Sequence, residues 1–166
     1  MTDQPLAFDP IARAADLWAE RVGPSGVMAA VTSVMRVQQI LQSAVDSALR
    51  PHGLTFARYE ALVLLYFSRR GNLPMRVMGQ RLQLHPTSVT NIVDRLEADG
   101  LVKRIPHPTD RRTTLVEITE QGRVRRDAAT AAVTEVEFGL RGLSDKQTAT
   151  LTDLLAKVRK ASGDFI

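Results

Sequence analysis

Residues 74–104 decide the fold, and they read PMRVMGQRLQLHPTSVTNIVDRLEADGLVKR. The spacing of apolar residues predicts a short helix over residues 77–82, which a turn then interrupts. Pro86 starts a second helix, because its missing N–H costs nothing in a first turn. That helix runs to about residue 99, where Gly100 provides the left-handed cap that ends a helix. Two helices joined by so tight a turn predict a helix-turn-helix.

The second helix of this pair separates apolar from polar side chains. Four apolar residues recur at helical spacing on the face expected to be buried, namely Val89, Ile92, Val93 and Leu96. The exposed face carries small polar residues and one arginine, namely Thr87, Ser88, Thr90, Asn91 and Arg95. In a DNA-reading helix such side chains reach base edges and phosphates. An ordinary solvated helix face is the alternative interpretation.

A β-hairpin is predicted directly after this helix. Two β-branched, apolar runs at 101–105 and 113–118 flank a turn that carries Asp110, Arg111 and Arg112 at its tip. An arginine on such a projection suits the negative potential of a narrow minor groove. Asp110 is placed to brace one guanidinium, and a surface salt bridge is the alternative role for Arg112. A helix-turn-helix followed by such a hairpin is a winged helix.

Basic residues concentrate around this motif. The chain of 166 residues has a formal charge of +4. Residues 69–126 hold twelve Lys or Arg and six Asp or Glu, so this segment is +6 and the remainder is −2. Eleven of the twelve cations are Arg, which is suited to bidentate contacts with phosphate and guanine. The segment therefore predicts a face that binds double-stranded DNA.

Helices are predicted on both sides of the winged segment, over residues 11–22, 27–49, 55–67, 120–140 and 145–161. They carry more apolar surface than a monomer of this size needs, which favours a homodimer. The predicted interface residues are Val31, Val34, Leu41, Val45, Leu151, Leu154, Leu155 and Val158. The fold class is mainly α with a small β wing, a winged helix-turn-helix flanked by long dimerisation helices. Its predicted parts are an N-terminal extension (1–26), a dimerisation region (27–50 and 120–166) and a DNA-binding lobe (51–119).

The sequence resembles the MarR family of bacterial winged-helix regulators over about residues 28–161. The resemblance rests on HGLTFARYEALVLL at 52–65, RLEADGLVKR at 95–104, the Asp110/Arg112 pair and ITEQG at 118–122. It implies a homodimer whose two winged lobes bind a pseudo-palindromic site, with Arg112 in the minor groove. It also implies a repressor that a small, often aromatic or anionic, effector releases.

Part of the chain is similar to the urate-responsive branch of that family, whose extra N-terminal helix brings a Trp to an effector pocket with one Asp and two Arg. Trp18 and Arg104 match two of these positions, whereas Glu60 replaces the Asp and Ile92 the second Arg. The missing cation argues against urate itself, and a hydrophobic anchor is the preferred role for Trp18. The resemblance implies an effector site near the helices at 27–49 and 55–67 and the recognition helix, with Trp18, Arg36, Tyr59 and Arg104 as the candidate residues. An anionic aromatic ligand would need an arginine and an aromatic wall.

Other function classes lack their sequence signals. The absence of cysteine excludes disulfides and thiol chemistry. Nucleotide-binding, zinc-protease and nucleophile-elbow motifs are absent and the three histidines lie in turns, so no enzyme, cofactor or metal site is expected. The longest apolar run, 61–67, is too short to span a membrane, and the expected location is cytoplasmic, nucleoid-associated when bound to DNA. A winged helix that docks a protein without reading DNA remains the alternative, although the polar recognition helix argues against it.

Overall fold

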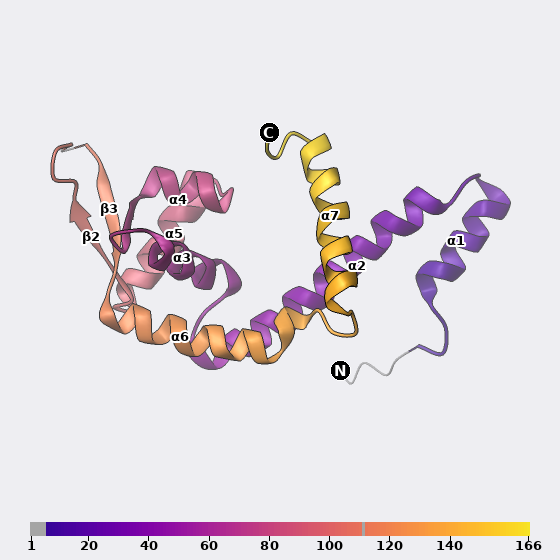
Figure 1. The fold of residues 1–166 in the computed structure, drawn as a ribbon, viewed down its shortest axis with the longest axis horizontal. Coiled ribbons are helices and arrows are strands. Elements are labelled where there is room, and N and C mark those ends of the chain that lie inside the picture. The colour runs from indigo at the N-terminus through magenta and orange to yellow at the C-terminus, as the bar shows by residue number, and fades with distance from the viewer. Residues whose placement is uncertain (1–5, 111) are drawn as a thin grey trace.

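Long helices extend to one side of a small winged lobe (Figure 1). The computed structural model describes residues 6–110 and 112–166. Its elements, in chain order, are α1 (Pro10–Arg21), α2 (Gly26–Leu49), the 3₁₀ turn η1 (Arg50–His52), α3 (Phe56–Phe67), β1 (Asn72–Pro74), α4 (Met75–Leu82), α5 (Pro86–Ala98), β2 (Val102–Pro106), β3 (Thr114–Ile118), α6 (Glu120–Glu135), the 3₁₀ turn η2 (Glu137–Gly139) and α7 (Asp145–Ala161). The predicted fold class, mainly α with a small β wing, is confirmed.

One apolar core holds the lobe together. The apolar face of α5 lies as expected, with Val89, Val93 and Leu96 buried and Ile92 partly buried against the core. The other helices and the sheet add further buried residues, among them Leu49, Leu62, Leu65, Met78, Val116 and Val133. The C-terminal part of α2 and the buried side of α6 therefore belong to the same core as the recognition helix.

The sheet has three antiparallel strands in the order β1-β3-β2. Strands β2 and β3 form the predicted wing, with Arg104 opposite Val116. Strand β1 was not predicted, since residues 68–72 were expected to form a loop. This strand has only three residues and no alternating pattern, and it forms because Leu73 pairs with Val116 of β3. Its partner is far away in the sequence, so no local signal marks it.

Helix α6 ends at Glu135, earlier than the predicted residue 140. Glu137, Phe138 and Gly139 follow with left-handed φ angles of 51°, 52° and 81°. The chain turns here because Gly139 packs closely on α2, where an added Cβ atom would lie 2.8 Å from the Cβ of Ala44. This turn directs α7 away from the axis of α6 (Figure 1).

The helices outside the lobe expose much of their apolar surface. Val31 and Val34 of α2 are each 51% exposed, and Val158 of α7 is 64% exposed. Val45 departs from the predicted interface, because it is 5% exposed and lies in the core of its own chain. Leu41 is half-buried next to Gly139. The apolar stripe of α2 thus divides into an exposed N-terminal part and a C-terminal part that belongs to the lobe.

Across residues 6–110 and 112–166, no helix is both long and apolar enough to cross a membrane. Within the same residues, no three His, Asp or Glu side chains group in a way that would hold a metal ion.

Gly122 allows α6 to start directly beside the beginning of β2. A Cβ atom at this position would overlap the carbonyl oxygen of Leu101 and lie 2.9 Å from the Cγ1 atom of Ile118. Gly122→Ala is therefore expected to lower the free energy of unfolding by about 3 kcal/mol in urea denaturation. Gly26→Ala is the matched control, since nothing lies within 4 Å of its added methyl group. Equal stability of the two variants would contradict this account of the junction.

Candidate nucleic-acid interface

The recognition helix α5 begins with a histidine cap. The Nδ1 atom of His85 accepts a hydrogen bond from the backbone N–H of Thr87 at 3.3 Å, which leaves Nε2 as a donor toward solvent in the neutral ring. All five predicted DNA-contacting residues of this helix are exposed, namely Thr87, Ser88, Thr90, Asn91 and Arg95. The hydroxyl of Thr90 also donates to the Pro86 carbonyl at 3.1 Å, which holds that side chain against its own helix.

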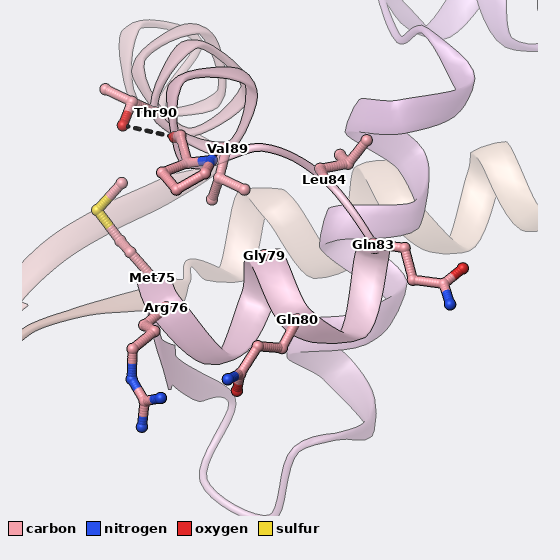
Figure 2. A pocket seen from close by; sticks show the side chains of 9 residues that line it. Met75, Arg76, Gly79, Gln80, Gln83, Leu84, Val89 and Thr90 are labelled. Carbon is pink, nitrogen blue, oxygen red and sulfur yellow. Dashed lines mark hydrogen bonds between the residues drawn. The ribbon is translucent and has the colours of Figure 1, made fainter. Parts of the chain in front are cut away.

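A groove of about 560 Å³ separates α4 from the start of α5 (Figure 2). Its lining residues are Met75, Arg76, Gly79, Gln80, Gln83, Leu84, Pro86, Val89 and Thr90. Gly79 permits the two helices to approach, since a Cβ atom there would lie 3.3 Å from the carbonyl oxygen of Leu84 and 3.4 Å from Cγ2 of Val89. Arg76, Gln80 and Gln83 extend outward from α4.

Asp110 organises the backbone of the wing tip. Its Oδ1 accepts the backbone N–H of Arg112 at 2.9 Å, and its Oδ2 accepts the hydroxyl of Thr113 at 2.6 Å. The bond from Thr113, followed by that from Arg112, lowers the pKa of Asp110 below its ordinary value. His107 adds a third bond, since its Nδ1 accepts the backbone N–H of Asp110 at 3.1 Å.

The predicted brace between Asp110 and an arginine side chain is therefore corrected for Arg112. Asp110 binds the backbone of Arg112 instead, and it makes no ion pair within the described part of the chain. The carboxylate is occupied because the turn brings backbone and hydroxyl donors closer than the long guanidinium arm. Arg111, the other candidate, lies outside the described residues. The side chain of Arg112 is exposed at the tip.

A second cleft, of about 490 Å³, lies between the wing and the start of α4. It is lined by Pro74, Met75, Arg76, Val77, His107, Arg112, Thr113 and Thr114. Met75 and Arg76 line both clefts, so the recognition helix, α4 and the wing form one continuous surface. No local sequence signal marks Arg76 as a contact residue, because only the folding of the wing against α4 brings it to the same cleft as Arg112.

Asn91 and Arg95 also border a smaller cleft, of about 320 Å³, between α3 and α5. Thr55, Arg58 and Ile92 complete its lining. The Nη1 atom of Arg58 in α3 forms an ion pair with Oδ2 of Asp99, at the end of α5, at 3.3 Å. The polar face of α5 therefore continues from the wing side of the lobe to the α3 side, and Arg95 belongs to the α3 end.

Two of the candidate effector residues have structural roles inside the lobe. Tyr59 is 5% exposed, and its hydroxyl lies 3.1 Å from Oγ1 of Thr130, which joins α3 to α6. Arg104 forms ion pairs with Asp94, at 2.5 Å, and with Glu97. Burial lowers the pKa of Arg104, but the hydrogen bonds to Asp94 and Glu97 outweigh this effect and raise it. Tyr59 is thus closed to solvent, and Arg104 already has two carboxylate partners.

The other two effector candidates lie outside the lobe. Trp18 is 41% exposed on α1, which packs beside α2 far from the wing (Figure 1). Arg36 is exposed on α2 and donates to Gln39 at 3.2 Å. A single chain therefore does not bring the four residues together.

Comparison with known proteins agrees with this geometry. The model of the MarR family matches residues 52–113. The structure of Sco5413, a MarR family transcriptional regulator from Streptomyces coelicolor, is 50% identical with a TM-score of 0.76, over 84% of this chain and 96% of that one. The chain belongs to the MarR family. It is therefore a transcriptional regulator, as the resemblance implied, and not an enzyme.

Two further solved structures are similar to this MarR-family chain. CouR from Rhodococcus jostii RHA1, bound to p-coumaroyl-CoA, is 33% identical with a TM-score of 0.66, over 75% of this chain and 87% of CouR. A mutant MarR from E. coli, complexed with operator DNA, is 25% identical with a TM-score of 0.72, over 86% of this chain and 98% of that one.

The pKa of Asp110 tests the geometry of the wing tip. Both hydrogen bonds favour the charged carboxylate, so they stabilise the tip above the ordinary pKa, and this stabilisation is lost as the pH falls through the lowered value. Thr113→Val removes the largest contribution and is expected to raise the pKa of Asp110 toward its ordinary value in an NMR titration. Thr109→Val is the control, because the Thr109 hydroxyl contacts His107 instead. An unchanged pKa in Thr113→Val would rule out the bond.

Proposed function

We propose that this chain is a homodimeric repressor that binds a pseudo-palindromic operator and is released by a small aromatic or anionic effector. The observation that carries the proposal is the continuous surface formed by the polar face of α5, the start of α4 and the wing tip with Arg112. The operator complex of the similar E. coli MarR supports it.

The proposed DNA contacts divide by groove. Thr87, Ser88, Thr90, Asn91 and Arg95 of α5 face the bases and phosphates of the major groove. The wing tip, with Asp110, Arg111 and Arg112, enters the adjacent minor groove, where an arginine meets a strongly negative potential. Arg76 lies between the two and contacts a phosphate. Phosphate contacts position the lobe, and base contacts provide the sequence preference.

The proposed dimer interface uses the apolar surface that one chain leaves exposed. It comprises Val31, Val34 and Leu41 of α2 with Leu151, Leu154, Leu155 and Val158 of α7, and omits Val45. Two copies related by a twofold axis would bury these residues and place two lobes on one side of the dimer. In this division, residues 1–26 form an extension, 27–50 with 120–166 the dimerisation region and 51–119 the DNA-binding lobe.

The proposed effector site lies beside the dimerisation helices. Trp18 and Arg36 remain accessible there, on α1 and α2, and they offer an aromatic wall and a cation. The binding of p-coumaroyl-CoA by CouR supports a ligand with an aromatic part and negative charge. Tyr59 and Arg104 would contribute through the packing of the lobe rather than by direct contact.

The test begins with selection of a duplex from a random DNA pool by the full-length protein. Fluorescence anisotropy then compares the selected duplex with its scrambled sequence at several salt concentrations. The proposal expects at least about 1,000-fold tighter binding to the selected duplex and a steep decrease with salt. Aromatic acids are then screened for release of the bound duplex. Equal binding to both duplexes would overturn the proposal and favour a protein-docking role for the winged lobe.

Two arginine variants distinguish the proposed minor-groove contact of Arg112 from the proposed phosphate contact of Arg76. Arg112→Ala is expected to cost about 2 kcal/mol or more on the selected duplex and little on the scrambled one. Arg76→Ala is expected to weaken both duplexes alike and to reduce the salt slope by about one. The same anisotropy assay measures both variants. Wild-type discrimination by Arg112→Ala would show that the wing does not read the operator.

The dimer interface is tested by a charge on α7. Val158→Asp places a carboxylate in the proposed apolar interface and is expected to yield monomers in sedimentation velocity. Val124→Asp is the matched control, because Val124 in the first turns of α6 is 62% exposed, close to the 64% of Val158, but is not one of the proposed interface residues. Monomers in both variants, or in neither, would contradict the assignment.

A further inference from the structure

We propose that Asp164 and Gln83 form a latch that positions the helix-turn-helix relative to α7, and this inference rests on the proposed function. The Nε2 atom of Gln83 donates to Oδ1 of Asp164 at 2.5 Å, across 81 residues of sequence. The C-terminus accordingly lies between α7 and α4 in Figure 1. Figure 2 shows the Gln83 side chain extending outward from the end of α4.

Gln83 occupies the turn that joins the two helices of the reading unit. It is the C-cap of α4, has a left-handed φ of 54°, and its backbone N–H donates to Gly79. His85 and Pro86, which begin the recognition helix, follow within three residues. A contact that restrains the Gln83 side chain therefore also restrains the position of the start of α5.

Asp164 is ordered by contacts within its own C-terminal turn, independently of Gln83. Gly163, with φ of 75°, ends α7 in a left-handed turn, in which the N–H of Asp164 donates to the Arg159 carbonyl at 3.1 Å and that of Gly163 to Lys160 at 3.0 Å. The guanidinium of Arg159 lies 3.6 Å from the second carboxylate oxygen and 5.3 Å from the ring centre of Phe165. Because the carboxylate is already ordered, less conformational entropy is lost when the latch forms.

The latch is the one side-chain hydrogen bond between residues 145–166 and the lobe within the described chain. The rest of α7 turns apolar residues to solvent, which the proposed dimer would cover. In that dimer, α7 is fixed at the twofold axis, so the latch limits how far each recognition helix can move from the axis. Asp164 and Gln83 are thus positioning residues that select the spacing between operator half-sites.

The first test varies the half-site spacing of the selected operator by insertion or deletion of one base pair. Wild type is expected to bind one spacing best. Gln83→Glu places two carboxylates together and is expected to reduce the discrimination between spacings about tenfold. Adding Asp164→Lys to Gln83→Glu restores an opposite-charge pair and is expected to restore the preference. Gln80→Glu adds the same charge to α4 away from Asp164, and should shift affinity equally at every spacing.

The second test needs no DNA. Because the chain has no cysteine, Gln80→Cys on α4 and Lys157→Cys on α7 accept spin labels specifically. Electron paramagnetic resonance on labelled chains diluted with unlabelled ones reports the distance within one chain. Gln83→Glu is expected to broaden this distance distribution, and the added Asp164→Lys to narrow it again.

The outcomes separate the latch from the proposed function. If Gln83→Glu keeps both the spacing preference and the narrow distance distribution, the latch proposal is wrong, whereas the proposed function as a DNA-binding regulator is unaffected. Loss of function in all variants, without rescue by the charge swap, assigns Gln83 to folding of the turn and also overturns it. A wild type without specific DNA binding overturns the proposed function, and the distance measurement then decides the latch alone.

Discussion

The shared apolar core is the constraint on which the other features depend. Leu49 at the end of α2 and Val133 of α6 are fully buried in the same cluster as Val93 of the recognition helix. Burial of side chains of this size provides about 1.5–3 kcal/mol each. The helices that leave the lobe are therefore continuous with its interior, and a lobe cannot rotate freely about them. This packing makes a winged helix and two long helices one mechanical unit.

Polar contacts then shape the reading surface on this core. His85 caps the recognition helix, and Asp110 with His107 closes the wing tip through backbone hydrogen bonds. These bonds leave the outer side chains, such as Arg112, available for DNA. Arg104 is different, because Asp94 and Glu97 already neutralise it on the flank of α5. The cations in the basic segment thus divide into those that join elements of the lobe and those that remain exposed.

The regulatory arrangement follows from what a single chain leaves exposed. Most of α2 before its last turns, and α7 along most of its length, present apolar residues to solvent. The hydrogen bond between Gln83 and Asp164 connects the C-terminal end of α7 to the turn between α4 and α5 without involving the core. Under the proposed function, a ligand beside α1 and α2 would act on helices that are connected to the recognition helix. Helix α2 is connected to it by packing in the core, and α7 by the hydrogen bond between Asp164 and Gln83.

The sequence by itself determined the helices, the wing and the faces of α5. These features depend on signals within a few residues, such as helical spacing, the left-handed Gly100 and the box of Ser144 with Gln147 that caps α7. The family, and with it the role as a regulator, was also recognisable from short motifs such as RLEADGLVKR.

Only the tertiary structure decided which residues meet across long separations. It paired β1 with β3, buried Tyr59 and placed Arg76 beside the wing. It also placed Val45 in the core and not in the expected interface. The N-terminal part of the apolar stripe of α2 is exposed, whereas its C-terminal part packs inside the lobe. Periodicity shows that a face is apolar or polar, but the partner of that face is set by how distant segments pack together.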